Sequence, residues 1–165
     1  MLSNNKYVHA LVRRLIILFV VTIFAFVIHR VSLSLHHQIF GAIIFIILFT
    51  SSLLYYYITL FKTKVMHPIE FLSSLFLVFF LTILMFSLIY NEPINDSETY
   101  FIENGAVKND LSFSSSFYFS TVTITTLGYG DIAPVGSYRF FAMTEVMLGL
   151  IYGGTIIYFL TRAFE

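Results

Sequence analysis

Long apolar stretches constrain this chain more than any other feature of its sequence. Three approach or exceed the roughly 20 residues that a helix needs to cross a bilayer; they are residues 39–61, 69–90 and 140–160. A fourth, residues 15–28, reaches that length only if residues 10–14 extend it and their arginines reach back to the interface. Charged residues make up 11% of the chain, against roughly 25% in soluble domains. The sequence therefore predicts an all-α membrane protein with four transmembrane helices.

The first stretch has a second interpretation, because basic residues before a short apolar core are also typical of a cleaved signal peptide. No small-x-small cleavage site follows in residues 26–30, which favours a retained helix.

Basic residues are distributed unevenly between the loops. Six lie on one side of the predicted spans, and they are Lys6, Arg13, Arg14, Lys62, Lys64 and Arg162. Three lie on the other side, and they are Arg30, Lys108 and Arg139. The positive-inside rule then predicts a multi-pass protein of the cell membrane with both termini in the cytoplasm. Since the formal net charge is zero and no basic block occurs, nucleic acid is not an expected partner.

The one clearly polar stretch lies between the third and fourth spans. Residues 91–110 are rich in Asn, Asp, Pro and Gly, which predicts an irregular extracellular loop. Five acidic residues accompany a single lysine there, and a negative mouth would concentrate cations. A merely solvated loop explains the same composition equally well.

The next segment is too short and too rich in hydroxyl groups to span a membrane. It begins with serines that suit a helix N-cap, at Ser112 and residues 114–116. The pattern predicts a short helix over residues 112–125 that enters the membrane from outside. Non-helical backbone after it is tolerated only if it is buried in protein or lines a water-filled cavity.

That backbone suits the coordination of a dehydrated potassium ion. Such an ion needs about eight oxygens, which two stacked rings of carbonyls from four chains supply. Successive carbonyls reach one axis only if φ is positive at alternate positions, which Gly128 and Gly130 tolerate. Leu127 and Tyr129 then point away from the axis, and Thr126 adds a hydroxyl ring at the cytoplasmic end. We expect partial negative charge at the end of the preceding helix to stabilise a cation below this filter.

Residues 121–134 (TVTITTLGYGDIAP) resemble the pore signature of potassium channels, and residues 69–160 resemble their outer helix, pore helix, filter and inner helix. The resemblance implies potassium sites at the carbonyls of Thr126, Leu127, Gly128 and Tyr129, and at the Thr126 hydroxyl. It places Asp131 at the outer mouth. The residues expected to support the filter are Thr125, Asp131, Tyr118 and Val122. Gly149 matches a hinge glycine of the inner helix, although close packing of helices together with Gly153 and Gly154 is an alternative.

Three residues depart from the family pattern. Leu127 replaces the commoner valine, which alters packing behind the filter. Tyr118 and Phe119 stand where many relatives have two tryptophans, and only Tyr118 can donate a hydrogen bond to the filter surround. Val122 replaces a glutamate that some bacterial relatives pair with the mouth aspartate, so Asp131 must find another partner.

The predicted organisation has two parts and assembles as a homotetramer in the lipid bilayer, with K⁺ as permeant ion and no cofactor. Residues 1–63 form a peripheral pair of transmembrane helices. Residues 64–165 form the pore domain, with the outer helix at 69–90, the turret at 91–111, the pore helix at 112–125, the filter at 126–130 and the inner helix at 139–161.

Two weaker signals have structural and functional interpretations. Glu145, inside the last span, is expected to pair with Arg139 or with hydroxyls of the pore helix rather than to act directly in function. The histidines of the first extracellular loop could sense pH or bind a metal, but interface histidines are favoured; they are His29, His36 and His37.

Several functional classes compete with a selective channel. The first two spans carry no row of charges, so they do not form a voltage sensor. A non-selective cation channel of the same fold would be expected to lose Tyr129 or a filter glycine. An active potassium transporter needs four pore loops in one chain, and a non-conducting regulatory subunit would be silent when expressed alone. An enzyme is not expected, since no nucleophile, base and orienting group or metal set occurs.

Overall fold

The computed structural model describes residues 68–163, together with residues 44 and 47. The chain divides into two compact units, Met1–Met66 and His67–Glu165. The helix pair predicted in residues 1–63, and the histidines within it, lie outside the described residues. The second unit contains three helices and a small sheet, in the order α3, β1, β2, α4, β3 and α5.

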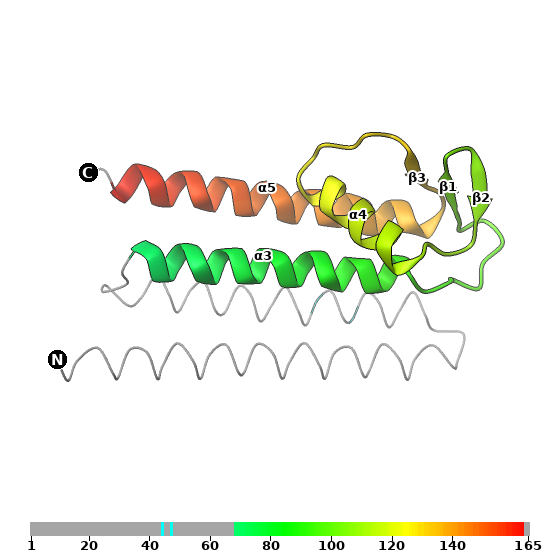
Figure 1. The fold of residues 1–165 in the computed structure, drawn as a ribbon, viewed down its shortest axis with the longest axis horizontal. Helices are drawn as coiled ribbons and strands as arrows, with labels where there is room; N and C mark the ends of the chain where they lie inside the picture. The colour runs from blue at the N-terminus through cyan, green and yellow to red at the C-terminus, as the bar shows by residue number, and fades with distance from the viewer. Residues whose placement is uncertain (1–43, 45–46, 48–67, 164–165) are drawn as a thin grey trace. The chain divides into compact units, whose positions relative to one another are not determined.

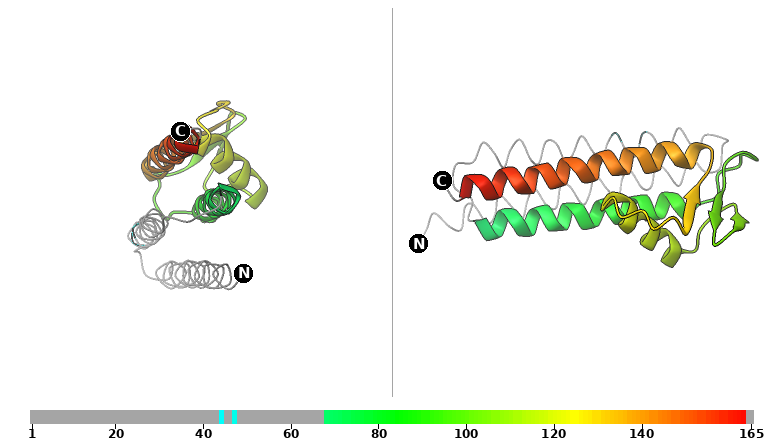
Figure 2. Two further views of the ribbon diagram at one scale, coloured as in Figure 1. Left: turned by 90° about the vertical axis from the view of Figure 1, so that its left-hand side faces the viewer. Right: turned by 90° about the horizontal axis from the view of Figure 1, so that it is seen from above.

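Two long helices run side by side through this unit (Figures 1 and 2). Helix α3 covers Pro68–Tyr90 and helix α5 covers Ser137–Ala163. Proline suits the first position of α3, because its missing N–H would be unpaired there anyway. Deep between the helices, the hydroxyls of Thr82 and Tyr152 share a hydrogen bond of 2.8 Å. Each helix coincides within two residues with the outer or inner helix expected from the sequence.

Within the described residues, the 22-residue segment Ser137–Tyr158 of α5 is long and apolar enough to cross a membrane, with a mean hydropathy of 1.6 over an 18-residue window. Leu75–Tyr90 of α3 forms a shorter apolar helix. Several large apolar side chains of α5 face outward, and Met143, Met147 and Leu150 are each more than 60% exposed. Such a surface is suited to lipid or to another protein chain rather than to water.

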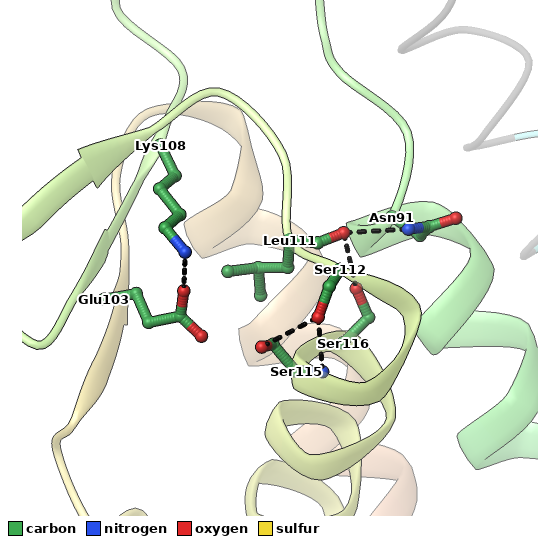
Figure 3. Close-up of polar contacts among 7 residues, drawn as sticks. All are labelled: Asn91, Glu103, Lys108, Leu111, Ser112, Ser115 and Ser116. Carbon is green, nitrogen blue, oxygen red and sulfur yellow. Dashed lines mark hydrogen bonds and ion pairs between the residues drawn. The ribbon is translucent and has the colours of Figure 1, made fainter.

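Helix α4, Phe113–Ile124, is a short helix of 12 residues, about 18 Å long and thus unable to span a bilayer. Ser112 caps its first turn by accepting a hydrogen bond from the Ser115 N–H at 3.2 Å (Figure 3). The carbonyl of Leu111 anchors the same end, because it accepts a hydrogen bond from the Asn91 side chain at 2.8 Å. The N-cap predicted among the serines is therefore confirmed at Ser112.

The prediction of an irregular loop before α4 is wrong for residues 101–108. Strand β1, Phe101–Glu103, pairs antiparallel with β2, Ala106–Lys108, and also with β3, Ile132–Pro134. The sheet order is β2-β1-β3. Asn104 and Gly105 form the two-residue turn, both with positive φ (50° and 83°), as hairpin turns matched to strand twist require. The second unit is thus mainly helical but carries a small three-stranded sheet.

A cluster of buried aromatic rings joins the sheet to all three helices. The ring of Phe101 in β1 stacks on Tyr138 in α5 with centroids 4.1 Å apart. Tyr90 of α3 and Phe119 of α4 meet Phe101 edge-on, at 5.8 and 5.6 Å. Since aromatic rings bury large areas and prefer such offset or edge-on contacts, this cluster fixes the sheet to the C-terminal end of α3 and the N-terminal end of α5.

Candidate functional site

The loop that follows α4 has an alternating backbone. Thr126, Gly128 and Gly130 all have positive φ, at 60°, 51° and 82°, whereas Leu127 and Tyr129 between them do not. Positive φ at the two glycines agrees with the sequence expectation. At Thr126 it is a departure, because a β-branched residue rarely adopts this conformation. Backbone strain of this kind persists only where the surroundings enforce it, and it gathers at functional sites.

The amides of the inner half of this loop turn back toward α4. The N–H groups of Leu127 and Gly128 both donate to the Val122 carbonyl, at 2.9 and 3.2 Å, and the Thr126 N–H donates to Thr123 at 3.0 Å. Val122 therefore supports the loop through its backbone carbonyl, while its side chain is buried. Val122 was expected among the residues that support the filter, but its residue type carries no signal for this contact, since any residue offers the same carbonyl.

The carbonyl oxygens of the loop differ from its amides, because they lack hydrogen-bond partners among the described residues. Within residues 68–163, no hydrogen bond reaches the carbonyl oxygens of Thr126, Leu127, Gly128 or Tyr129. The loop is also exposed in the single chain, with Leu127 and Tyr129 at 60% and 68%. A row of unpaired carbonyls on an exposed loop provides oxygen ligands for a hard cation, but one chain supplies only part of a coordination shell.

Asp131, directly after the loop, lies beside Tyr118 of α4. Desolvation, and then the hydrogen bond and charge of Asp131, raise the pKa of the Tyr118 phenol. The Tyr118 ring also stacks on Tyr129, with centroids 6.4 Å apart and planes 6° from parallel. The Tyr118 phenol thus lies near Asp131, and the partner that Asp131 was expected to need in the absence of a glutamate at residue 122 stays a prediction.

Thr125 closes the C-terminal end of α4. Its N–H donates to the Thr121 carbonyl at 3.2 Å, and its hydroxyl donates to the same carbonyl at 2.6 Å. The last turn of the helix is therefore capped by the residue that begins the TTLGYGD motif, and support of the filter by Thr125 stays a prediction.

Glu145 is a fully buried carboxylate that joins the three helices. Tyr90 of α3 donates to one of its oxygens at 2.8 Å, and Ser120 of α4 donates to the other. The alternative of a pore-helix hydroxyl partner is therefore confirmed, whereas pairing with Arg139 is wrong. The Arg139 Nε instead donates to the Pro134 carbonyl, at 3.2 Å.

Gly149 is a point of close contact rather than a visible bend, because α5 continues through it without interruption. A Cβ atom there would lie 2.0 Å from the Ile124 carbonyl oxygen at the end of α4. At Gly153 and Gly154 the same atom would meet nothing within 4 Å. Close packing is thus present, but it joins α5 to α4 and does not involve the other two glycines.

Side-chain metal chemistry has no support in the part of the chain that the structure describes. No group of three or more His, Cys, Asp or Glu side chains there could hold a metal ion. The chemically distinctive feature of this unit is therefore the backbone of residues 126–130, supported from behind by α4.

Comparison with known proteins is consistent with this geometry. A family model described as "Ion channel" matches residues 74–165. Two curated relatives, each named protein LctB, come from Bacillus caldotenax and Geobacillus stearothermophilus. They are 38% and 40% identical over 55 residues, which cover 33% of this chain and 41% of each relative. The chain thus spans about two fifths of the length of the curated relatives it matches. No solved structure matches it.

Proposed function

Because the chain belongs to the ion channel family, whose model matches more than half of it, we propose that it is the subunit of a potassium-selective channel. It is a membrane protein that conducts ions, and that family is not one of enzymes. The proposal adds the identity of the ion, the filter that selects it and the number of subunits around it.

The backbone of the candidate filter carries the proposal. Alternating positive φ at Thr126, Gly128 and Gly130 is the geometry that turns successive carbonyls toward one line. The carbonyls of residues 126–129 make no other hydrogen bond within residues 68–163. Four such strands around an axis would supply rings of oxygens that replace the hydration shell of K⁺. The smaller Na⁺ would fit these rings less well, so exchanging its hydration water for carbonyl oxygens would be less favourable for Na⁺ than for K⁺.

Assembly into a homotetramer is the second part of the proposal. A single strand is open on one side, so a lone subunit cannot surround an ion. An apolar groove of about 500 Å³ runs along the outer half of α5, next to exposed Met143 and Met147. Its lining residues are Pro134, Arg139, Ala142, Met143, Val146, Met147 and Leu150. A neighbouring copy in that groove would cover this surface and complete the ring of carbonyls.

Helix α4 would assist the ion below the filter. The C-terminal end of a helix carries partial negative charge, and α4 ends at Ile124, directly before the filter. Four such ends would stabilise a cation as it exchanges water for carbonyl oxygens.

The helix pair predicted in residues 1–63 would be peripheral to the pore and would carry no voltage-sensing charge. Potassium flux through purified residues 64–165 would test whether the pore conducts without this pair.

A bi-ionic recording of the purified protein in planar bilayers tests the proposal. With potassium on one side and sodium on the other, we expect a reversal potential close to the potassium equilibrium value. Reversal near zero would instead identify a non-selective cation channel of the same fold. Complete silence of a tetrameric preparation would favour a non-conducting regulatory subunit.

Replacing Gly128 by alanine sharpens the same experiment. Alanine resists the left-handed conformation by about 1–2 kcal/mol in each subunit, so Gly128→Ala should abolish selective current. Gly154→Ala is the matched control, since a Cβ there meets nothing within 4 Å and should leave the reversal potential unchanged. Selective current through Gly128→Ala would contradict the proposed filter.

A further inference from the structure

The two halves of the candidate filter differ in what holds them. Three amides of the inner half, at Thr126, Leu127 and Gly128, donate to carbonyls of α4. Within residues 68–163, the amides of Tyr129 and Gly130 in the outer half donate to no backbone group. The outer half therefore depends on what fixes the residues just beyond it.

The β1–β2 hairpin holds those residues. The N–H of Asn104, at the tip of the hairpin, donates to the carbonyl of Asp131 at 2.9 Å. Directly after Asp131 the chain becomes β3, which pairs with β1 through the partners Glu103↔Ile132 and Ile102↔Ala133. The chain leaving the filter is thus a strand of the outer sheet.

The same hairpin also reaches the start of α4. The side chain of Glu103 forms an ion pair with Lys108 across the hairpin (Figure 3). Hydrogen bonds from Lys108, and then from Ser115 in the first turn of α4, lower the pKa of Glu103. The Glu103 side chain of the hairpin therefore lies near the first turn of α4, while the backbone of Asn104 holds the chain after the filter.

A third set of contacts fixes the sheet to the beginning of α5. The N–H of Val135 donates to the Tyr100 carbonyl at 2.9 Å, and the N–H of Ser137 donates to the Thr99 hydroxyl at 3.2 Å. Gly136 has φ of 62°, and a Cβ there would lie 2.4 Å from the Glu98 carbonyl. This packing leaves no room for a side chain between Gly136 and the loop before β1.

We propose that the β1–β2 hairpin is a strut that keeps the outer half of the filter in its conducting shape, with Asn104 as the positioning residue. When the bond from Asn104 to Asp131 opens, Tyr129 and Gly130 lose their nearest backbone support and the outer carbonyls leave the ion axis. The strut thereby sets how long a channel conducts before its filter closes. This inference rests on the proposed function.

The first test compares two substitutions at Asn104 in the full-length channel. Asn104→Pro removes the N–H and excludes the positive φ of 50°, whereas Asn104→Gly keeps both. We measure the decay of potassium current under constant voltage, at low and high external potassium. Loss of one backbone hydrogen bond corresponds to about a fivefold change in equilibrium, so Asn104→Pro should speed decay at least about fivefold. High external potassium should slow that decay, because ions in the filter hold its carbonyls together, and Asn104→Gly should match the wild type.

The second test strengthens the strut. Ile102 and Ala133 are directly paired across β1 and β3, at a Cα separation that a disulfide bridges. The chain has no cysteine, so Ile102→Cys with Ala133→Cys can form a bond only between these two positions within a subunit. We expect oxidised channels to decay at least about fivefold more slowly than the same channels after reduction. This test stays decisive if Asn104→Pro fails to assemble.

The outcomes separate the strut from the proposed function. A wild type without potassium selectivity overturns the proposed function by itself. A selective wild type whose decay is the same in Asn104→Pro and Asn104→Gly overturns the strut. So does a disulfide that leaves the decay unchanged. Faster decay that external potassium does not slow would assign Asn104 a role in folding alone.

Discussion

The inner and outer ends of the candidate filter are supported by different kinds of structure. The inner end rests on buried contacts among helices, where Gly149 meets Ile124 and Glu145 accepts from Ser120. The outer end rests on an exposed hairpin and on the stacking of Tyr118 against Tyr129. Buried contacts are difficult to change without loss of the fold, whereas exposed ones respond to the solution outside. From this comparison we expect changes at the inner end to affect assembly and changes at the outer end to affect the lifetime of the conducting state.

The largest effect is expected where α5 touches the end of α4. In Gly149→Ala the new Cβ would lie 2.0 Å from a backbone oxygen, which cannot rotate aside as a side chain does. We expect a loss of about 3 kcal/mol per subunit, the upper end of overpacking costs. Thermal dissociation of the purified oligomer should show it. Gly153→Ala, with nothing within 4 Å of its Cβ, is the control, and equal dissociation temperatures for the two variants would refute the close contact.

The buried carboxylate should give the next largest effect. Glu145→Leu leaves the Tyr90 hydroxyl without its acceptor, while Ser120 can still donate to the Ile83 carbonyl at 3.0 Å. One unpaired buried hydroxyl costs about 2 kcal/mol, measured as a lower dissociation temperature. Glu145→Gln keeps an acceptor and should restore most of the stability. If both variants are equally unstable, charge rather than hydrogen bonding fixes the three helices.

At the outer end, Tyr118→Phe should change function more than stability. The substitution removes the hydroxyl that faces Asp131 but keeps the ring that stacks on Tyr129. We expect potassium current to decay several-fold faster, with little change in oligomer dissociation. Tyr100→Phe is the control, since the Tyr100 hydroxyl makes no hydrogen bond within residues 68–163. A large drop in dissociation temperature with normal decay would remove the contrast between the two ends.

External acid should give the smallest effect, confined to the outer end. The lowered pKa of Glu103 means that its contacts add stability above its ordinary value of 4.5 and lose it as pH falls below that value. A hydrogen bond with Thr99 lowers the pKa of Asp96, so the contacts of Asp96 also lose their stabilising effect as pH falls. Current decay should therefore be constant near neutral pH and slightly faster at about pH 4. Glu103→Gln should remove part of this dependence and Asp96→Asn the rest; an unchanged pH profile in both would exclude these carboxylates.

How far the sequence could predict these features depends on whether the signal was local. Positive φ at Gly128 and Gly130 was predictable, because glycine is the residue that tolerates it. Positive φ at Thr126 was not, since β-branched residues avoid it. The hairpin carried a strong local signal in Asn104-Gly105 between apolar residues, but the polar composition around it favoured an irregular loop.

For contacts between residues far apart in the chain, the sequence predicts the type of partner but not which residue provides it. A carboxylate inside an apolar helix needs partners, but Ser120 and Tyr90 lie 25 and 55 residues from Glu145 in the sequence. Only the packing of α3, α4 and α5 selects them over Arg139. Likewise, glycine at residue 149 indicates close approach or flexibility, and only the fold shows that Ile124 is the neighbour.

The attachment of α5 at its outer end has a mechanical consequence. Tyr138 in its first turn donates to the carbonyls of Glu92 and Asn109, and Ser137 is held by Thr99. Further along, the contacts of Glu145, Gly149 and Tyr152 hold the helix against α3 and α4. The 11 residues after Tyr152, residues 153–163, form a rod of about 16 Å. A tilt of about 5° around Tyr152 would displace the far end of α5 by roughly 1.4 Å over that length, while the chain around the sheet stays in place.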